Sequence, residues 1–158
     1  MGHPSASVAI HAPIDRVWSV MLDTASYGEW NPFVERADCS SDPAVGDPIV
    51  LHVRWPNGKT TRSPERISAI EPLATDGDVT TACLSYVYEG LPAKLGLVRG
   101  TRHQRLRQEG VGPTTYDTVE EFTGPLVRFA GPERVAEGFA RHAAALRRRA
   151  EELAWPHP

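Results

Sequence analysis

Hydrophobic positions at the start of the chain predict a strand, a short amphipathic helix and a tight aromatic turn. Residues 5–11 form the expected strand, which ends before Pro13. A proline suits the first turn of a helix, because its missing N–H is one that a helix start leaves unbonded anyway. Apolar residues then recur at helical spacing, at Ile14, Val17, Trp18, Met21 and Leu22. The helical stretch reaches Trp30, and Asn31-Pro32 is a turn signal before the next extended run.

The middle of the chain alternates strand-like runs with turns. In residues 49–55, apolar side chains alternate with a largely polar set, which is typical of a half-buried strand. The six strands expected here cover residues 34–39, 49–55, 62–71, 79–89, 97–109 and 114–124. Since parallel pairing would need crossover helices, the short links between these strands predict an antiparallel meander, with residues 90–96 as a loop.

One long helix is predicted at the end of the chain, over residues 132–153. Pro132 fits its first turn, and Glu133 lies where the helix dipole favours a negative charge. A three/four spacing defines one apolar stripe, formed by Val135, Phe139, His142, Leu146 and Leu153. The concave face of the antiparallel sheet is the surface available to bury this stripe. The predicted fold class is therefore α+β.

Four short motifs resemble those of one protein superfamily. They are A-P-I-D-R-V-W at 12–18, D-x-x-x-Y-x-x-W-N-P-F at 23–33, E-E-F-T-G at 120–124, and Gly138-Phe139 with Leu146 and Ala150-Glu151. Together they resemble the START/Bet v 1-like SRPBCC superfamily, in particular its polyketide cyclase/dehydrase-like branch, over roughly residues 6–154. The motifs are specific for the fold and not for one activity, because this superfamily includes binders, transporters, cyclases and resistance proteins.

The resemblance implies a helix-grip fold, in which a curved antiparallel sheet of about seven strands wraps around the C-terminal helix and two short helices follow the first strand. One such domain accounts for residues 1–158, a length that suits a single core. A curved sheet cannot contact a straight helix along its whole length, so a cavity is expected between them. Small residues on the helix would leave space for this cavity, namely Ala136, Ala140, Ala143, Ala144, Ala145 and Ala150. Alternatively, alanine is present as the best helix former and the core closes over it.

Composition narrows the range of partners. The formal net charge is -3, with 41% hydrophobic and 23% charged residues, so neither nucleic acid nor an anionic membrane is an expected partner. No apolar run is long enough to cross a membrane and no secretory signal is present, so we expect a cytoplasmic monomer or weak dimer. Cys39 and Cys83 are expected to be free thiols. The six histidines are scattered and no phosphate-binding glycine loop occurs, so we expect no metal and no cofactor.

Candidate ligand-binding residues are those that face the expected cavity from the helix and the strands. His142 shares the helical stripe with Phe139 and therefore points toward the sheet. It is either an acid–base group of the site or a core histidine with its own hydrogen-bond partner. Trp30 and Trp55 are expected to close the ends of the cavity, and Trp30 could equally anchor the core.

The last strand offers a second set of candidates on one of its two faces. The resemblance places Phe122 inward, and the alternation along a strand places Tyr116, Thr118 and Glu120 on the same face. Burial would raise the pKa of the Glu120 carboxyl and make it an acid or base. An arginine partner would instead give Glu120 a structural role.

The strand over 97–109 is unusual because residues 103–108 are overwhelmingly polar. If Leu106 faces inward with Gln104, the guanidinium groups of Arg105 and Arg107 stay in solvent. We therefore expect a basic outer face and an inward hydrogen-bonding glutamine. The preceding strand contributes an inward, partly aromatic set, namely Leu84, Tyr86 and Tyr88.

Three functions remain open on this basis. The first is binding of a hydrophobic, polyketide-like or aromatic natural product in specialised metabolism, either in biosynthesis or in self-resistance such as enediyne sequestration. The second is a polyketide cyclase or aromatase, in which His142, Glu120, Tyr86 and Tyr88 would assist cyclisation and dehydration of a poly-β-ketone. The third, also implied by the resemblance, is a regulatory partner of the Hsp90-activator type.

Overall fold

The structure, a computed structural model, describes residues 3–156. The main elements follow the predicted order of strands and helices. They are β1 (Ser5–Ile10), α1 (Ile14–Leu22), the 3-10 turn η1 (Thr24–Ser26), α2 (Tyr27–Trp30), β2 (Val34–Asp38), β3 (Pro48–Arg54), β4 (Thr60–Asp76), β5 (Val79–Tyr88), α3 (Leu91–Lys94), β6 (Arg99–Glu109), β7 (Thr114–Thr123), the 3-10 turn η2 (Val127–Ala130) and α4 (Pro132–Ala154).

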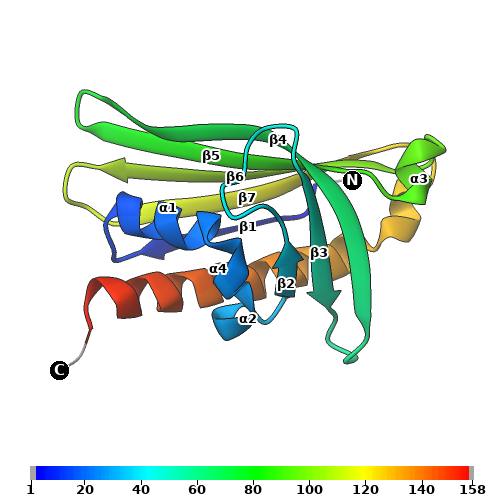
Figure 1. Ribbon diagram of the computed structural model, residues 1–158, viewed down its shortest axis with the longest axis horizontal. Helices are drawn as coiled ribbons and strands as arrows, with labels where there is room; N and C mark the ends of the chain where they lie inside the picture. Colours follow the sequence, from blue (N-terminus) through cyan, green and yellow to red (C-terminus); the bar gives the residue numbers. More distant parts are fainter. Residues whose placement is uncertain (1–2, 157–158) are drawn as a thin grey trace.

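The strands form one antiparallel sheet in the order β1-β7-β6-β5-β4-β3-β2. From β2 to β7 each strand pairs with its neighbour in sequence, which confirms the predicted meander, and β1 pairs with β7. β4 is longer than the predicted strand and its register shifts twice, between Ile67 and Ala69 and between Glu71 and Ala74. Such bulges bend a strand. In Figure 1, β4 curves from its hairpin with β3 beside α4 to its hairpin with β5.

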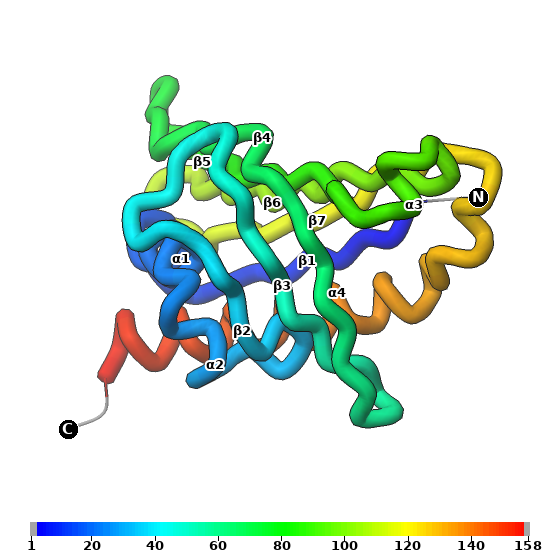
Figure 2. Tube along the Cα trace, turned by 45° about the vertical axis from the view of Figure 1, so that its right-hand side comes forward, coloured from blue at the N-terminus to red at the C-terminus, as the bar shows by residue number. Residues whose placement is uncertain are grey.

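The bent sheet wraps around α4, so the α+β helix-grip class is confirmed. Figures 1 and 2 show α4 running along one face of the sheet, with β2 and β3 crossing it steeply. The predicted loop over 90–96 contains one short helical turn, α3, which starts with Pro92 in its first turn.

The buried face of α4 differs in part from the predicted stripe. Its buried residues are Gly138, Phe139, His142, Ala143, Ala145, Leu146 and Ala150. Leu153 is 40% exposed, because the last turn of α4 lies beside His11, past the end of β1. Ala140 and Ala144 are exposed and face no cavity. The C-terminal half of α4 packs against α1 and β1, so its buried alanines belong to a closed core there.

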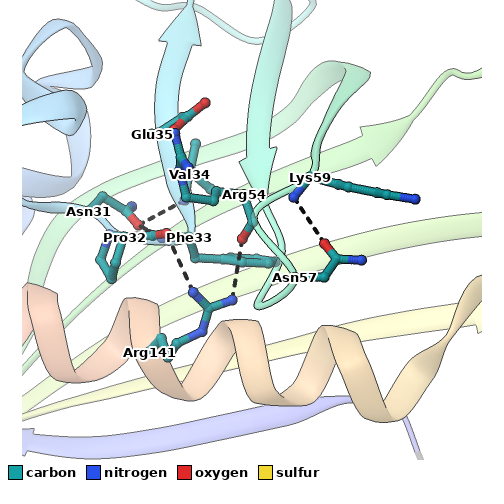
Figure 3. Close-up of polar contacts among 9 residues, drawn as sticks. All are labelled: Asn31, Pro32, Phe33, Val34, Glu35, Arg54, Asn57, Lys59 and Arg141. Atoms are coloured by element: carbon teal, nitrogen blue, oxygen red, sulfur yellow. Dashed lines mark hydrogen bonds and ion pairs between the residues drawn. The ribbon is translucent and has the colours of Figure 1, made fainter.

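Asn31 and Arg141 hold the junction between α2, β2 and α4 (Figure 3). The side-chain oxygen of Asn31 accepts hydrogen bonds from the backbone N–H groups of Phe33 (3.0 Å) and Val34 (2.9 Å). Arg141 on α4 donates to the backbone oxygen of Pro32 (3.5 Å) and to that of the last residue of β3 (3.3 Å). These bonds place the Phe33 ring between α4 and the sheet.

Gly138 lets α4 approach the Phe33 ring, and this contact leads to a prediction. A Cβ atom at Gly138 would overlap the Phe33 ring, which is held edge-to-face by Trp55 and Phe139. Gly-to-Ala substitution inside a helix usually stabilises by about 1 kcal/mol. Here we expect Gly138→Ala to lower the free energy of unfolding by about 1–3 kcal/mol, measured by urea denaturation. The loss should shrink in a Phe33→Leu background, and a stabilised Gly138→Ala protein would contradict the packing described.

Both cysteines are free, with Cys39 half-buried and Cys83 buried on β5. No helix within residues 3–156 is long and apolar enough to cross a membrane.

Candidate functional site

A cavity of about 430 Å³ lies between the sheet and the N-terminal half of α4. Strands β2 to β7 and α4 supply its walls, and residues next to α3 and in η2 border it on the side of solvent. Its aromatic lining consists of Phe33, Trp55, Tyr88, Phe122, Phe129 and Phe139. A volume of this size is within the usual range for a small-molecule site.

The inner aromatic wall is rigid because its rings pack on one another. Phe33 lies edge-to-face against Trp55, with ring centroids 5.5 Å apart, and against Phe139, with centroids 6.0 Å apart. The guanidinium group of Arg134 lies over the Trp55 ring, 4.2 Å from its centroid. Such contacts hold aromatic rings in one orientation. The cavity therefore presents a preformed apolar surface.

Arg102 brings a fixed positive charge to the cavity. It lies on β6, is 4% exposed, and also lines the cavity. Its Nε donates to Thr118 Oγ1 (2.9 Å) and its Nη2 to Tyr116 Oη (3.2 Å). The guanidinium carbon lies 4.1 Å from the centroid of the Phe139 ring. These contacts use part of the five-donor fork of arginine and leave further N–H groups for a ligand.

Glu120 lies opposite Arg102 on β7 and is 7% exposed. The described residues contain no ion pair between the two, so the structural pairing considered for Glu120 does not form in this structure. Burial, reinforced by repulsion from Glu65 and opposed by Arg102, raises the pKa of Glu120 to about 8. At neutral pH this carboxyl is mainly protonated and can donate a hydrogen bond.

Glu65 is a second carboxyl of the cavity, contributed by β4. Its Oε1 accepts a hydrogen bond from Ser63 Oγ (3.1 Å). Burial raises the pKa of Glu65 to about 7, while the Ser63 hydrogen bond and the Arg102 charge act in the opposite direction. Both carboxyls therefore keep their protons to a higher pH than an ordinary glutamate does. Two such carboxyls beside a cation are suited to acid–base chemistry.

Gly100 makes room for the Glu120 carboxyl. It pairs with Phe122 across the β6–β7 ladder. A Cβ atom at Gly100 would clash with Oε1 of Glu120 and lie 3.1 Å from the Phe122 ring. The missing side chain thus allows the carboxyl to sit over β6 on the cavity side of the sheet.

His142 belongs to a separate, deeper polar cluster. Its Nδ1 accepts a hydrogen bond from Asn31 Nδ2 (3.1 Å), and its ring stacks on Tyr116, with centroids 6.0 Å apart. Burial, and secondarily the Arg102 charge, holds the pKa of His142 well below its usual value. His142 is therefore a neutral core histidine in this structure, 2% exposed and outside the cavity wall.

The predicted ligand-binding residues fall into two groups. Five line the cavity, namely Trp55, Tyr88, Glu120, Phe122 and Phe139. Eight lie outside its wall, namely Trp30, Leu84, Tyr86, Gln104, Leu106, Tyr116, Thr118 and His142. Of these, Tyr116 and Thr118 orient Arg102, and Trp30 packs edge-on against His142. Their direct contact with a ligand stays a prediction.

Two residues of the site were missing from the prediction, although strand alternation contained a signal for both. Arg102 lies on the same face of its strand as Gln104 and Leu106, which are inward as predicted. Glu65 shares a face with the buried Ile67. Charged side chains are seldom buried, so alternation alone did not single out either position. Within residues 3–156, no group of three or more acidic, histidine or cysteine side chains could hold a metal ion.

The raised pKa of Glu120 gives a prediction about stability. Between its unfolded value of 4.5 and about 8, the folded protein binds more protons than the unfolded chain, so the free energy of unfolding falls as the pH rises. His142 acts in the opposite direction, but only below 6.5. We expect a loss of about 1–2 kcal/mol from pH 6.5 to pH 8, measured by urea denaturation. Glu65, whose pKa is also raised, contributes to the same slope, so Glu120→Gln should remove the larger part and leave the rest. The exposed Glu121→Gln should keep the full slope, and an unchanged slope in Glu120→Gln would contradict the assignment.

Solved structures with the same fold come from bacteria and plants. The Zhui aromatase/cyclase from Streptomyces sp. R1128 has a TM-score of 0.72 and 18% identity, covering 98% of this chain and 96% of that one. The major latex-like protein 151 from Panax ginseng has a TM-score of 0.65 and 14% identity, covering 98% of both chains. Truncated norcoclaurine synthase from Thalictrum flavum has a TM-score of 0.62 and 14% identity, covering 100% and 98%. At these identities the similarity concerns the fold.

Sequence comparison identifies the family. A search of curated proteins found no match. Residues 1–151 match the family described as polyketide cyclase / dehydrase and lipid transport. This match covers nearly the whole chain, and it confirms the SRPBCC resemblance. The chain therefore belongs to the polyketide cyclase / dehydrase and lipid transport family.

Proposed function

We propose that this protein binds a hydrophobic, polyketide-like or aromatic natural product in the cavity between the sheet and α4. The observation that carries this proposal is the preformed aromatic wall around a space of about 430 Å³. A flat polycyclic guest would lie against the aromatic lining and leave a few polar groups to orient it. An enediyne is one possible guest of this kind, and its sequestration would be a form of the same binding.

A second candidate function, a cyclase or dehydratase, is supported by a specific observation. Glu65, Glu120 and Arg102 lie in the wall of a cavity whose other lining residues are mostly aromatic or aliphatic. A protein that only sequesters a hydrophobic guest gains nothing from burying three ionisable groups, because their burial costs free energy. The aromatase/cyclase title of the Zhui structure points in the same direction.

Binding can be tested by filling the cavity. Val98 lines it, and Val98→Trp should weaken binding of the aromatic polyketide emodin at least 10-fold, because the indole would occupy the space of one ring. Val111 lies at an exposed turn, so Val111→Trp is the matched control and should bind like the unmodified protein. Isothermal titration calorimetry with native mass spectrometry measures affinity and stoichiometry. Equal affinities in both variants would place the guest elsewhere, and the absence of emodin binding to the unmodified protein would count against this guest class.

A further inference from the structure

Arg102 carries a positive charge in the interior without an anionic partner. The side chain is 4% exposed, and none of the ion pairs within residues 3–156 includes it. Its two hydrogen bonds go to the neutral hydroxyl groups of Thr118 and Tyr116. Burial of a charge is costly unless an opposite charge compensates it. Because Arg102 lines the cavity, that opposite charge can come from a ligand.

The surroundings of Arg102 hold its guanidinium group in one orientation. Thr118 Oγ1 accepts from Nε at 2.9 Å, and Tyr116 Oη accepts from Nη2 at 3.2 Å. The Tyr116 hydroxyl donates its own proton to Gln104 Oε1 (2.8 Å), which fixes it as an acceptor toward Arg102. The Phe139 ring lies against the guanidinium group, at 4.1 Å from the ring centroid. Arginine has five N–H donors, so further donors stay available to a ligand.

Neighbouring titratable groups do not supply the missing negative charge in mildly acidic solution. Burial raises the pKa of Glu65 to about 7 and that of Glu120 to about 8, so both carboxyls are mainly protonated near pH 6. Burial also raises the pKa of the nearby tyrosines and lowers that of His142, so these groups are neutral there. The groups that feel the Arg102 charge are Tyr27 of α2, Glu65 of β4, Tyr86 of β5, Tyr116 and Glu120 of β7, and His142 of α4.

The entrance to the cavity is basic, although the whole chain has a formal net charge of -3. Residues 89–98 and 124–131 border the cavity and lie at the same end of the sheet, where a backbone hydrogen bond joins them (Figures 1 and 2). They carry the exposed Lys94 and Arg128, and the exposed Arg99 follows at the start of β6. Glu89 is the one acidic residue of these two connections, and it is paired with Arg66 (2.6 Å). Positive charge at an entrance attracts anionic ligands.

Charge and lining together select one class of ligand. A neutral guest would leave the Arg102 charge uncompensated, and a cation would be repelled by it. A phenol is neutral at this pH, since its ordinary pKa is about 10. A carboxylate is a planar group with one negative charge and two acceptor oxygens, which matches one guanidinium group. The aromatic and aliphatic lining requires that the rest of the ligand be hydrophobic.

We infer that the cavity binds a hydrophobic carboxylic acid, with its carboxylate against Arg102 and its apolar body against the aromatic lining. The inference rests on the proposed function, because it uses the same cavity and narrows the class of guest. Glu120 lies opposite Arg102 on the neighbouring strand, so its protonated carboxyl can donate to the second carboxylate oxygen. Gly100 leaves the space that the Glu120 carboxyl occupies. The ionisable groups of the wall thus have a role in binding alone.

Binding of a carboxylate should weaken as the pH rises. Once Glu65 or Glu120 is ionised, it repels the ligand carboxylate and competes with it for Arg102. Their pKa values of about 7 and about 8 place this change between pH 6 and pH 9. We expect the affinity to fall about 10-fold or more over this range. A neutral ligand of the same shape should lose much less affinity.

Isothermal titration calorimetry with 2-naphthoate and its neutral isostere 2-naphthamide tests the inference. At pH 6 the unmodified protein should bind 2-naphthoate about 10-fold or more tightly than 2-naphthamide, since hydrogen bonds to charged groups are the stronger ones. Arg102→Met should remove this preference. Arg105→Met is the matched control, because Arg105 lies on the same strand and is exposed on the outer face, and it should keep the preference. Glu120→Gln should retain more of the 2-naphthoate affinity at pH 9 than the unmodified protein does.

Emodin binding is measured in parallel for every variant, and it separates the two proposals and shows that a variant has folded. Emodin binding with no preference for 2-naphthoate over 2-naphthamide overturns the inference and leaves the proposed function intact. A preference that survives in Arg102→Met has the same consequence. So does a 2-naphthoate affinity that stays constant or rises from pH 6 to pH 9 in the unmodified protein, a measurement that needs no variant. A protein that binds none of the three compounds overturns the proposed function itself.

Discussion

Replacing Asn31 with alanine will lower the free energy of unfolding by about 3–5 kcal/mol. Asn31 is buried, and its side-chain oxygen accepts from the N–H groups of Phe33 and Val34 (Figure 3), while its amide donates to His142. Alanine would leave two backbone donors and one ring nitrogen without partners. Each buried group that loses its partner costs about 1–3 kcal/mol. Urea denaturation followed by circular dichroism measures the loss.

The matched control is Asn57→Ala in the β3–β4 hairpin (Figure 3). Asn57 makes the same type of contact, with its side-chain oxygen 2.9 Å from the backbone nitrogen of Lys59, but in an exposed turn. Water can replace that bond, so we expect a loss below about 1 kcal/mol. Similar losses in free energy of unfolding for the two variants would show that burial of the Asn31 hydrogen bonds does not add to their contribution to stability.

If the protein is a cyclase or dehydratase, the second candidate function, replacing Arg102 with methionine should reduce dehydration of a β-hydroxy ketone such as 4-hydroxy-4-phenylbutan-2-one roughly 100-fold or more, since removing one donor to a developing oxyanion has an effect of this size. Methionine has a similar length and can keep the contact with the Phe139 ring. The Arg102 charge also lowers the pKa of Glu120, so this pKa should rise further in the variant. Carboxyl chemical shifts in a pH titration measure that change directly. A role confined to folding would leave the Glu120 titration in place.

Two further arginine variants test whether the effect of Arg102→Met is specific to the Arg102 side chain. Arg105→Met changes a residue of the same strand that is exposed on the outer face, and it should retain activity. Arg102→Lys keeps the charge but cannot reproduce the fork that reaches Thr118 and Tyr116 together, so we expect partial activity. Full activity in Arg102→Met, or an equal loss in Arg105→Met, would refute the role given to Arg102.

For Glu120, the sequence predicts the direction of the side chain but not its partners. Strand alternation and the E-E-F-T-G motif place its side chain inward, and it is inward in the structure. Whether the carboxyl is paired or free could not be read from β7 alone. That depends on Gly100 and Arg102 of β6 and on Glu65 of β4, which the sheet brings together from distant positions in the chain.

His142 illustrates the opposite case. Its helical spacing correctly predicts burial, yet burial alone does not make it part of a ligand site. The Asn31 amide, 111 positions away in sequence, and the Tyr116 ring occupy its surroundings. The neighbours of a buried polar side chain decide its role, and those neighbours come from other elements of the fold.

The sequence by itself determined the strand-and-helix order, the antiparallel meander and the inward faces of β5, β6 and β7, because these follow from local periodicity and short connections. Only the tertiary structure decided where the interior is filled and where it is open. α1 and β1 close the core over the alanines of α4, whereas the bend of β4 leaves the other half of the helix beside a cavity. Packing between distant segments sets that boundary, and no local pattern encodes it.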